Sequence, residues 1–200
     1  MYEYFLKGGV VMYPILICSI VSLAIFLERL WALRRSKVIP EELLWEVFDL
    51  LNKGKVQEAQ RICRASESSL GQILYAGLSN LGKGRLTVRE KMEEVGRREL
   101  SFLERYLNVI GTIASIATLL GLLGTVTGMI KTFNVLAAKG VAEPGDVAGG
   151  ISEALITTAA GLIVAIPSLV MYHYLRSKVR SLALELEEVA LKLLDFLGKD

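Results

Sequence analysis

Histidine and cysteine, which commonly carry out catalysis or bind metals, are scarce in this sequence. It has one histidine, His173, and two cysteines, Cys18 and Cys63, among 200 residues. No metal-ligand cluster and no nucleophile-base pair can be assembled, so we expect no enzyme, no metal and no other cofactor. Cys18 falls in an apolar run and Cys63 in a hydrophilic stretch, so no disulfide is expected. Basic residues are not interleaved with aromatic ones, which argues against nucleic acid as a partner.

Charge is absent from two long runs and nearly absent from a third. Residues 8–27 and 106–130 contain no charged side chain, and residues 147–175 contain one, Glu153. A helix of about 20 apolar residues crosses the roughly 30 Å of hydrocarbon in a bilayer. No strand pattern competes with these runs. The sequence therefore predicts an all-α membrane protein with three transmembrane helices.

Lysine and arginine are distributed unevenly around the three runs. The stretch 28–105 has 15 of the 23, and the stretch from residue 176 onward has five. The positive-inside rule places both stretches in the cytoplasm, and the N-terminus and the connection between runs two and three outside. The first run could instead be a signal peptide. However, it is longer than the apolar core of a typical signal peptide, and no small-residue cleavage site precedes Glu28 and Arg29, so we interpret it as a retained anchor.

The expected organisation follows from these boundaries. It consists of a periplasmic N-terminus with transmembrane helix 1 (1–30), a cytoplasmic helical segment (31–105), transmembrane helix 2 (106–132), a periplasmic loop (133–146), transmembrane helix 3 (147–175) and a cytoplasmic helical tail (176–200).

Local signals predict helices between and beyond the spans. Pro40 is expected to open a helix that Gly54 closes, and residues 55–65 and 70–81 to form two more. Thr87 and Glu90 form a capping box, and no strong helix breaker follows before residue 130. One helix is therefore expected to run from the cytoplasm through the second span.

The third span is expected to have the same design. Asp146 is a suitable N-cap, and the helix can continue to residue 197 with a bend at Pro167. Beyond the membrane, apolar residues recur at steps of three and four, which indicates packing against neighbouring helices. These are Val179, Leu182, Leu186, Val189, Leu193 and Phe196.

Small and hydroxyl-bearing residues line one side of the second and third spans. In a membrane, such a face commonly serves close helix packing. Here hydroxyls recur, and Thr125 and Thr158 are expected about 7 to 11 Å below the outer surface, which favours a pore lining. The candidate pore and proton-pathway residues are Thr118, Thr125, Glu153, Thr157 and Thr158. The small residues that accompany them are Gly121, Gly124, Gly128, Ala154, Gly161 and Ala165.

Glu153 is the one acid within the three runs. A carboxylate in this setting costs about 2.5 to 3.5 kcal/mol unless it has water or a partner, so it is a functional candidate. It is five residues, or about 140° around a helix, from Thr158, and it faces either a pore mouth or a subunit junction. Threonine does not ionise near neutral pH, so a proton route needs a mid-membrane acid from another chain.

The sequence closely resembles the three-span ExbB/TolQ branch of the MotA/TolQ/ExbB proton-channel family. The resemblance covers essentially the whole chain. The matching stretches are residues 14–20 (PILICSI), 27–30 (LERL), 121–128 (GLLGTVTG) and 150–161 (GISEALITTAAG), the last continuing to Ile166 and Pro167. Thr127 departs from the family pattern, which often has an aromatic residue there.

The resemblance implies a homopentamer in the bacterial inner membrane, with helices two and three around a central pore. Thr125 and Thr158 would be pore threonines and Glu153 the family's intramembrane glutamate. The pore would hold helices of a small ExbD/TolR-type protein, whose aspartate accepts protons. Motion of that protein would pass work through a TonB- or TolA-type protein to the outer membrane.

Several alternatives stay open at the level of sequence. The chain could be a non-conducting membrane scaffold whose small residues serve only packing. A transporter of soluble substrates fits less well, because no inverted repeat is apparent. The sequence does not choose between ExbB-type nutrient uptake and TolQ-type envelope maintenance, nor between protons and sodium. It also does not give the stoichiometry with the partner.

Overall fold

The computed structural model describes residues 8–139 and 144–197, and within these ranges the chain forms helices and no strands. Three stretches are long and apolar enough to cross a membrane: Met12–Ala32, Arg85–Ala138 and Val147–Phe196. Only 17%, 33% and 28% of their most apolar windows are buried within the chain. Most of these side chains therefore point outward, as expected for a protein solvated by lipid or by further subunits. The predicted all-α membrane class is confirmed.

The chain divides into two compact units. The first contains residues 1–28 and 106–174, and the second contains residues 29–105 and 175–200. Helices α2 (Met12–Ala32) and α9 (Pro144–Leu197) have residues in both units, whereas α8 (Leu107–Lys139) lies in the first. The two units are described separately below.

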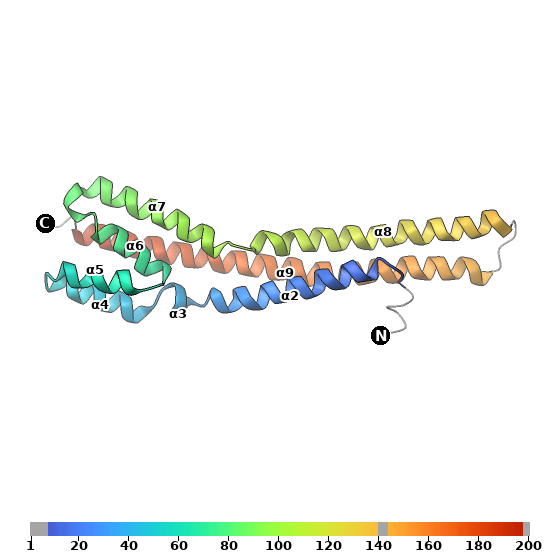
Figure 1. Ribbon diagram of the computed structural model, residues 1–200, viewed down its shortest axis with the longest axis horizontal. Coiled ribbons are helices and arrows are strands. Elements are labelled where there is room, and N and C mark those ends of the chain that lie inside the picture. Colours follow the sequence, from blue (N-terminus) through green and yellow to red (C-terminus); the bar gives the residue numbers. More distant parts are fainter. Residues whose placement is uncertain (1–7, 140–143, 198–200) are drawn as a thin grey trace. The chain divides into compact units, whose positions relative to one another are not determined.

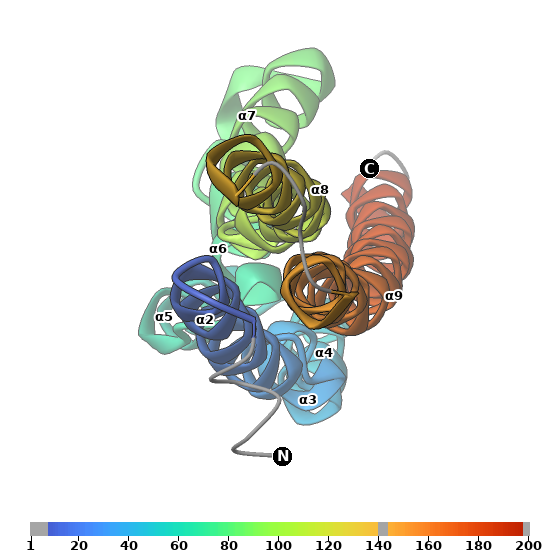
Figure 2. The ribbon, with the colours of Figure 1, turned by 90° about the vertical axis from the view of Figure 1, so that its right-hand side faces the viewer.

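The first unit consists of α2, α8 and the first part of α9 (Figure 1). Seen along their length, these form three distinct columns (Figure 2). Residues further along α8 contact residues earlier in α9: Gly121 lies against Gly161, and Gly128 lies against Gly150. The two helices are therefore antiparallel. Between α2 and α9, the buried hydroxyls of Ser22 and Ser168 share a hydrogen bond of 2.8 Å. A polar pair of this kind satisfies two hydroxyls that lipid could not.

The second unit is a set of shorter helices around the end of α9. They are α3 (Arg35–Val38), α4 (Glu41–Asn52), α5 (Val56–Ala65), α6 (Ser69–Leu78), the 3-10 turn η1 (Leu81–Lys83) and α7 (Arg85–Leu103). α6 is the most buried of them, because eight of its ten residues are covered. Ser68 caps it by accepting a hydrogen bond from the Gly71 amide at 3.1 Å. Exposed ion pairs such as Arg35–Glu185 (2.8 Å) contribute little beside this apolar core.

The expected packing stripe of the C-terminal segment is confirmed. Val179, Leu182, Leu186, Val189 and Leu193 are all buried. Phe196 completes the stripe through an edge-on contact with Phe48 of α4, with ring centroids 6.4 Å apart. The continuous helix predicted to residue 197 is confirmed as well.

The long helix predicted from Thr87 through the second span is wrong, because α7 and α8 are separate. The chain leaves the helix at residues 104–106, and Tyr106 has φ of 67°. A non-glycine residue rarely adopts the left-handed conformation, because it costs free energy. Helix propensity therefore does not predict a break at this tyrosine.

Two of the predicted helix starts are also wrong. α7 begins at Arg85 after Gly84, so Thr87 lies inside the helix and does not cap it. α9 begins at Pro144, so Asp146 is within its first turn. Proline suits the first position of a helix, because its missing N–H would have no intrahelical partner there.

The expected periplasmic segments are described only in part. Residues 1–7 and 140–143 lie outside the described residues, whereas the flanking parts of the 133–146 segment are helical.

Among the shorter elements, the helix after Pro40 ends before Gly54 as predicted, and Gly54 has φ of 72°. α6 ends at Leu78, three residues earlier than expected.

Candidate functional site

Glycine and alanine bring α8 and α9 into direct backbone contact. A Cβ added at Gly161 would lie 2.6 Å from the carbonyl oxygen of Ala117 and 2.9 Å from the Cα of Gly121. One added at Gly128 would lie 2.8 Å from the carbonyl oxygen of Gly150 and 2.9 Å from the Cβ of Ala154. No larger residue fits these positions without moving a helix. The structure thus places Gly121, Gly124, Gly128, Ala154 and Gly161 in the contact between the two helices.

Thr158 lies at the edge of this contact and bonds across it. Its hydroxyl lies 3.1 Å from the Gly121 carbonyl on α8 and 3.0 Å from the Ala154 carbonyl one turn back on α9. A hydroxyl has one proton, so it serves one carbonyl at a time. In a regular helix, the Gly121 carbonyl also accepts from the amide of Thr125. The bond therefore sets Thr158 within one turn of Thr125 along the helix pair.

Thr125 and Thr118 flank the same contact on α8. Thr125 is half-buried and Thr118 is exposed. Each hydroxyl donates back to its own helix, Thr125 to the Leu122 carbonyl at 2.6 Å and Thr118 to the Ala114 carbonyl at 3.0 Å. Because only the donors are occupied, the oxygen lone pairs remain available to accept hydrogen bonds.

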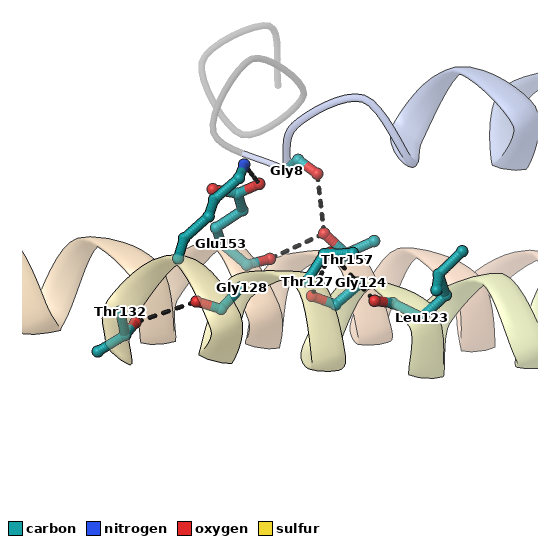
Figure 3. Close-up of polar contacts among 9 residues, drawn as sticks. Gly8, Leu123, Gly124, Thr127, Gly128, Thr132, Glu153 and Thr157 are labelled. Carbon is teal, nitrogen blue, oxygen red and sulfur yellow. Dashed lines mark hydrogen bonds and ion pairs between the residues drawn. The ribbon is translucent and has the colours of Figure 1, made fainter. Parts of the chain in front are cut away.

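Thr157 is fully buried and does not face an open surface. Its hydroxyl lies 2.9 Å from the Gly8 carbonyl and 2.8 Å from the Glu153 carbonyl, so it connects α9 to the segment that precedes α2 (Figure 3). It also fills the space left by the missing side chain of Gly124. The structure therefore gives Thr157 a packing position.

Glu153 forms an ion pair with Lys131 of α8. The Glu153 side chain is 20% exposed and that of Lys131 is 58% exposed. Lys131 was not identified as a site residue from the sequence, because lysines and arginines were considered there only for the membrane topology. The signal was available in the sequence, since Lys131 and Glu153 are isolated opposite charges on antiparallel helices near their connection.

The remaining candidates lie further along α9. Ala165 is buried, and Ser168 bonds to Ser22 as described above. Pro167 lies inside α9, which continues past it. Proline leaves the carbonyl four residues back, that of Ile163, without its helical donor. The bend expected at this position stays a prediction.

The arrangement offers carbonyls, which accept hydrogen bonds, hydroxyls, which both donate and accept them, and one acid that is already paired. In the described part of the chain, no group of three or more His, Cys, Asp or Glu side chains could hold a metal ion. Threonine hydroxyls do not ionise near neutral pH. Transfer of a proton along α8 and α9 therefore calls for an acid from elsewhere.

Comparison with known proteins identifies the class. The model of the MotA/TolQ/ExbB proton channel family matches residues 65–188, which include α8 and every candidate residue on α9. The chain is 40% identical over 176 residues to ExbB-like protein 1 of Synechocystis sp., covering 86% of this chain and 69% of that protein. It is 34% identical to an ExbB homolog of Methanothermobacter thermautotrophicus, covering 88% and 63%. Against the Tol-Pal system protein TolQ of Haemophilus influenzae it is 29% identical, covering 90% and 86%.

The chain belongs to the MotA/TolQ/ExbB proton channel family, a family of transport and channel subunits. The resemblance to its ExbB/TolQ branch is confirmed, because relatives of both names match most of the chain. Its three apolar helices and these relatives indicate an inner-membrane protein.

Proposed function

We propose that this protein is a proton-channel subunit of an inner-membrane motor. Together with an ExbD/TolR-type protein, it would convert proton motive force into mechanical work that a TonB- or TolA-type protein delivers to the outer membrane. The N-terminus and the connection between α8 and α9 would face the periplasm, and the second unit would face the cytoplasm, following the positive-inside rule.

The proposed assembly is a homopentamer around a central pore lined by α8 and α9. Large apolar side chains cover the free surface of this helix pair, which supports burial by lipid or by neighbouring copies. On α8 these include Leu119, Leu122, Leu123 and Val126, and on α9 Leu155, Leu162, Ile163 and Ile166.

One observation carries the proposal. The hydrogen bond from Thr158 to the Gly121 carbonyl sets two half-buried threonines within one turn of each other, on two helices of a proton-channel family member. Repeated around a ring, this arrangement gives a belt of hydroxyl oxygens that can accept hydrogen bonds from water or from a partner's acid. The driving force is adequate, since one charge crossing 100 mV releases about 2.3 kcal/mol.

Substitution of Thr158 tests the proposal. Thr158→Val removes the hydroxyl with little change in volume, and Thr158→Ser keeps it. In vesicles containing the protein with its partner, we expect the valine variant to lose proton flux by about tenfold or more and the serine variant to stay within about threefold. Pentamer recovery in detergent is the control for folding.

The competing function is a non-conducting scaffold whose small residues serve only packing. The glycine contact between α8 and α9 favours a packing role for those particular residues. Under the scaffold function, Thr125→Ala and Thr158→Ala would be silent, because alanine packs at least as closely as threonine. Full activity of both alanine variants in the assembled protein would refute the channel proposal.

A further inference from the structure

Three segments of the first unit meet near the connection between α8 and α9, in what we term the end cluster: Gly8, Gly9, Lys131, Glu153 and Thr157. Lys131 comes from α8, Glu153 and Thr157 from α9, and the two glycines precede α2. The ammonium group of Lys131 contacts the Glu153 carboxylate, and the Thr157 hydroxyl reaches the Gly8 carbonyl. The cluster thus ties the three segments together.

The Glu153 carboxylate occupies space that exists because Gly9 has no side chain. A Cβ at Gly9 would collide with Oε1 of Glu153 and lie 3.2 Å from its Cδ. Gly9 also has φ of +69°, which a glycine adopts without strain. The carboxylate therefore points toward α8 and the segment before α2.

The same orientation directs Glu153 away from the threonine face. Glu153 and Thr158 are five residues apart, which is about 140° around a helix. If Thr158 lines the pore, Glu153 lies outside that lining. The ion pair with Lys131 also gives the carboxylate a partner of opposite charge, which favours its ionised form in an apolar setting.

We propose that Lys131 is a positioning residue, and that its pair with Glu153 clamps α8, α9 and the segment before α2 at one end of the pore. In this arrangement Glu153 acts as the anion of the clamp and does not carry protons. The inference rests on the proposed function, because it assigns the part that Glu153 plays within that channel.

The two charges provide the test, since a clamp depends on opposite charges whereas a proton carrier depends on an acid at position 153. The full-length protein and its partner are reconstituted in vesicles for proton flux, and pentamer recovery and the midpoint of thermal unfolding are measured in parallel. The single variants are Lys131→Met, Lys131→Arg and Glu153→Gln. The double variants are the exchange, Lys131→Glu with Glu153→Lys, and the neutral pair, Lys131→Met with Glu153→Gln.

We expect Lys131→Met and Glu153→Gln each to lower the flux by about tenfold, because each leaves one charge unpaired. Lys131→Arg keeps the cation and should stay within about threefold of the wild type. The exchange should restore flux to that range. The neutral pair should conduct about threefold better than the worse single variant, because neither charge is left alone, but less well than the exchange, because the attraction between the two charges is lost.

An exchange and a neutral pair that assemble but remain as inactive as Glu153→Gln would overturn the proposal, because position 153 would then need an acid. If the exchange does not assemble, the neutral pair decides. A loss in Lys131→Arg as large as in Lys131→Met would also overturn it.

Failure of the proposed function gives a different result. If the wild-type complex conducts no protons, that function is wrong, and the clamp is judged by unfolding alone. Lys131→Met and Glu153→Gln should then lower the midpoint of thermal unfolding, Lys131→Arg should keep it, and at least one double variant should restore it. Independent, additive losses would contradict the clamp.

Discussion

Gly161 is the residue on which the α8–α9 contact depends most directly. Its Cα hydrogens face the Ala117 carbonyl and the Gly121 backbone, so there is no side chain nearby that could move aside. A methyl group at this position must displace a helix. Gly149 of the same helix offers a contrast, since nothing lies within 4 Å of the position its Cβ would take.

We therefore expect Gly161→Ala to destabilise the protein by about 1 to 3 kcal/mol, as overpacking of a close contact does. Gly149→Ala should be neutral or stabilising, because alanine favours helix by about 1 kcal/mol over glycine. Unfolding in mixed micelles with increasing denaturant measures both. Equal effects from the two substitutions would contradict the close contact.

Cys63 provides a second prediction at this scale. It is fully buried in α5, and burial raises the pKa of its thiol to about 12. Because the thiolate is the reactive form, hardly any reactive form is present at neutral pH. In a Cys18→Ser background, a water-soluble maleimide should leave Cys63 unmodified at pH 7.5 and label it once denaturant is added. Rapid labelling of the folded protein would show that the second unit does not bury this thiol.

The sequence names the candidate residues but says little about their surroundings. Thr125, Thr158 and Glu153 follow from composition, depth and family resemblance. Which glycines touch a backbone depends on the rotation of α8 against α9, and the hydrogen bond from Thr157 to Gly8 depends on where the segment before α2 meets α9. The pattern of a single helix specifies neither. The Lys131–Glu153 pair required considering two distant residues together.

At the scale of elements, the break between α7 and α8 is the main departure from the sequence-based expectation. The residues around it favour helix, and the turn depends on one backbone conformation, that of Tyr106. By contrast, α9 was predicted through to residue 197, because its apolar stripe persists and Pro167 is the one proline inside the helix. Long periodic segments are predictable, whereas a single left-handed residue is not.

Tyr106 permits a matched test of that turn. Tyr106→Gly and Tyr106→Ala remove the same side chain, but only glycine adopts a φ of 67° without cost. We expect the glycine variant to be more stable than the alanine variant by about 1 to 2 kcal/mol, compared by denaturant unfolding. If alanine were as stable as glycine, α7 and α8 would be joined through a regular helical turn.

At the scale of the whole molecule, the charge distribution predicts how the chain crosses the membrane. Ser79 in the second unit and Ala138 near the end of α8 are both exposed. With the native cysteines replaced by serine, Ser79→Cys should be labelled by an impermeant thiol reagent only in inverted vesicles. Ala138→Cys should be labelled only in intact spheroplasts. The reverse labelling pattern would show that the chain has the opposite orientation in the membrane.

The glycine contact has a mechanical consequence. Where the backbones of α8 and α9 touch, there are no side chains that could change rotamer. The two helices therefore have no alternative packing arrangement at this contact. α8 and the part of α9 that it contacts should consequently move as one rigid body, and in the proposed channel any change of shape would have to take place in the partner's helices inside the ring.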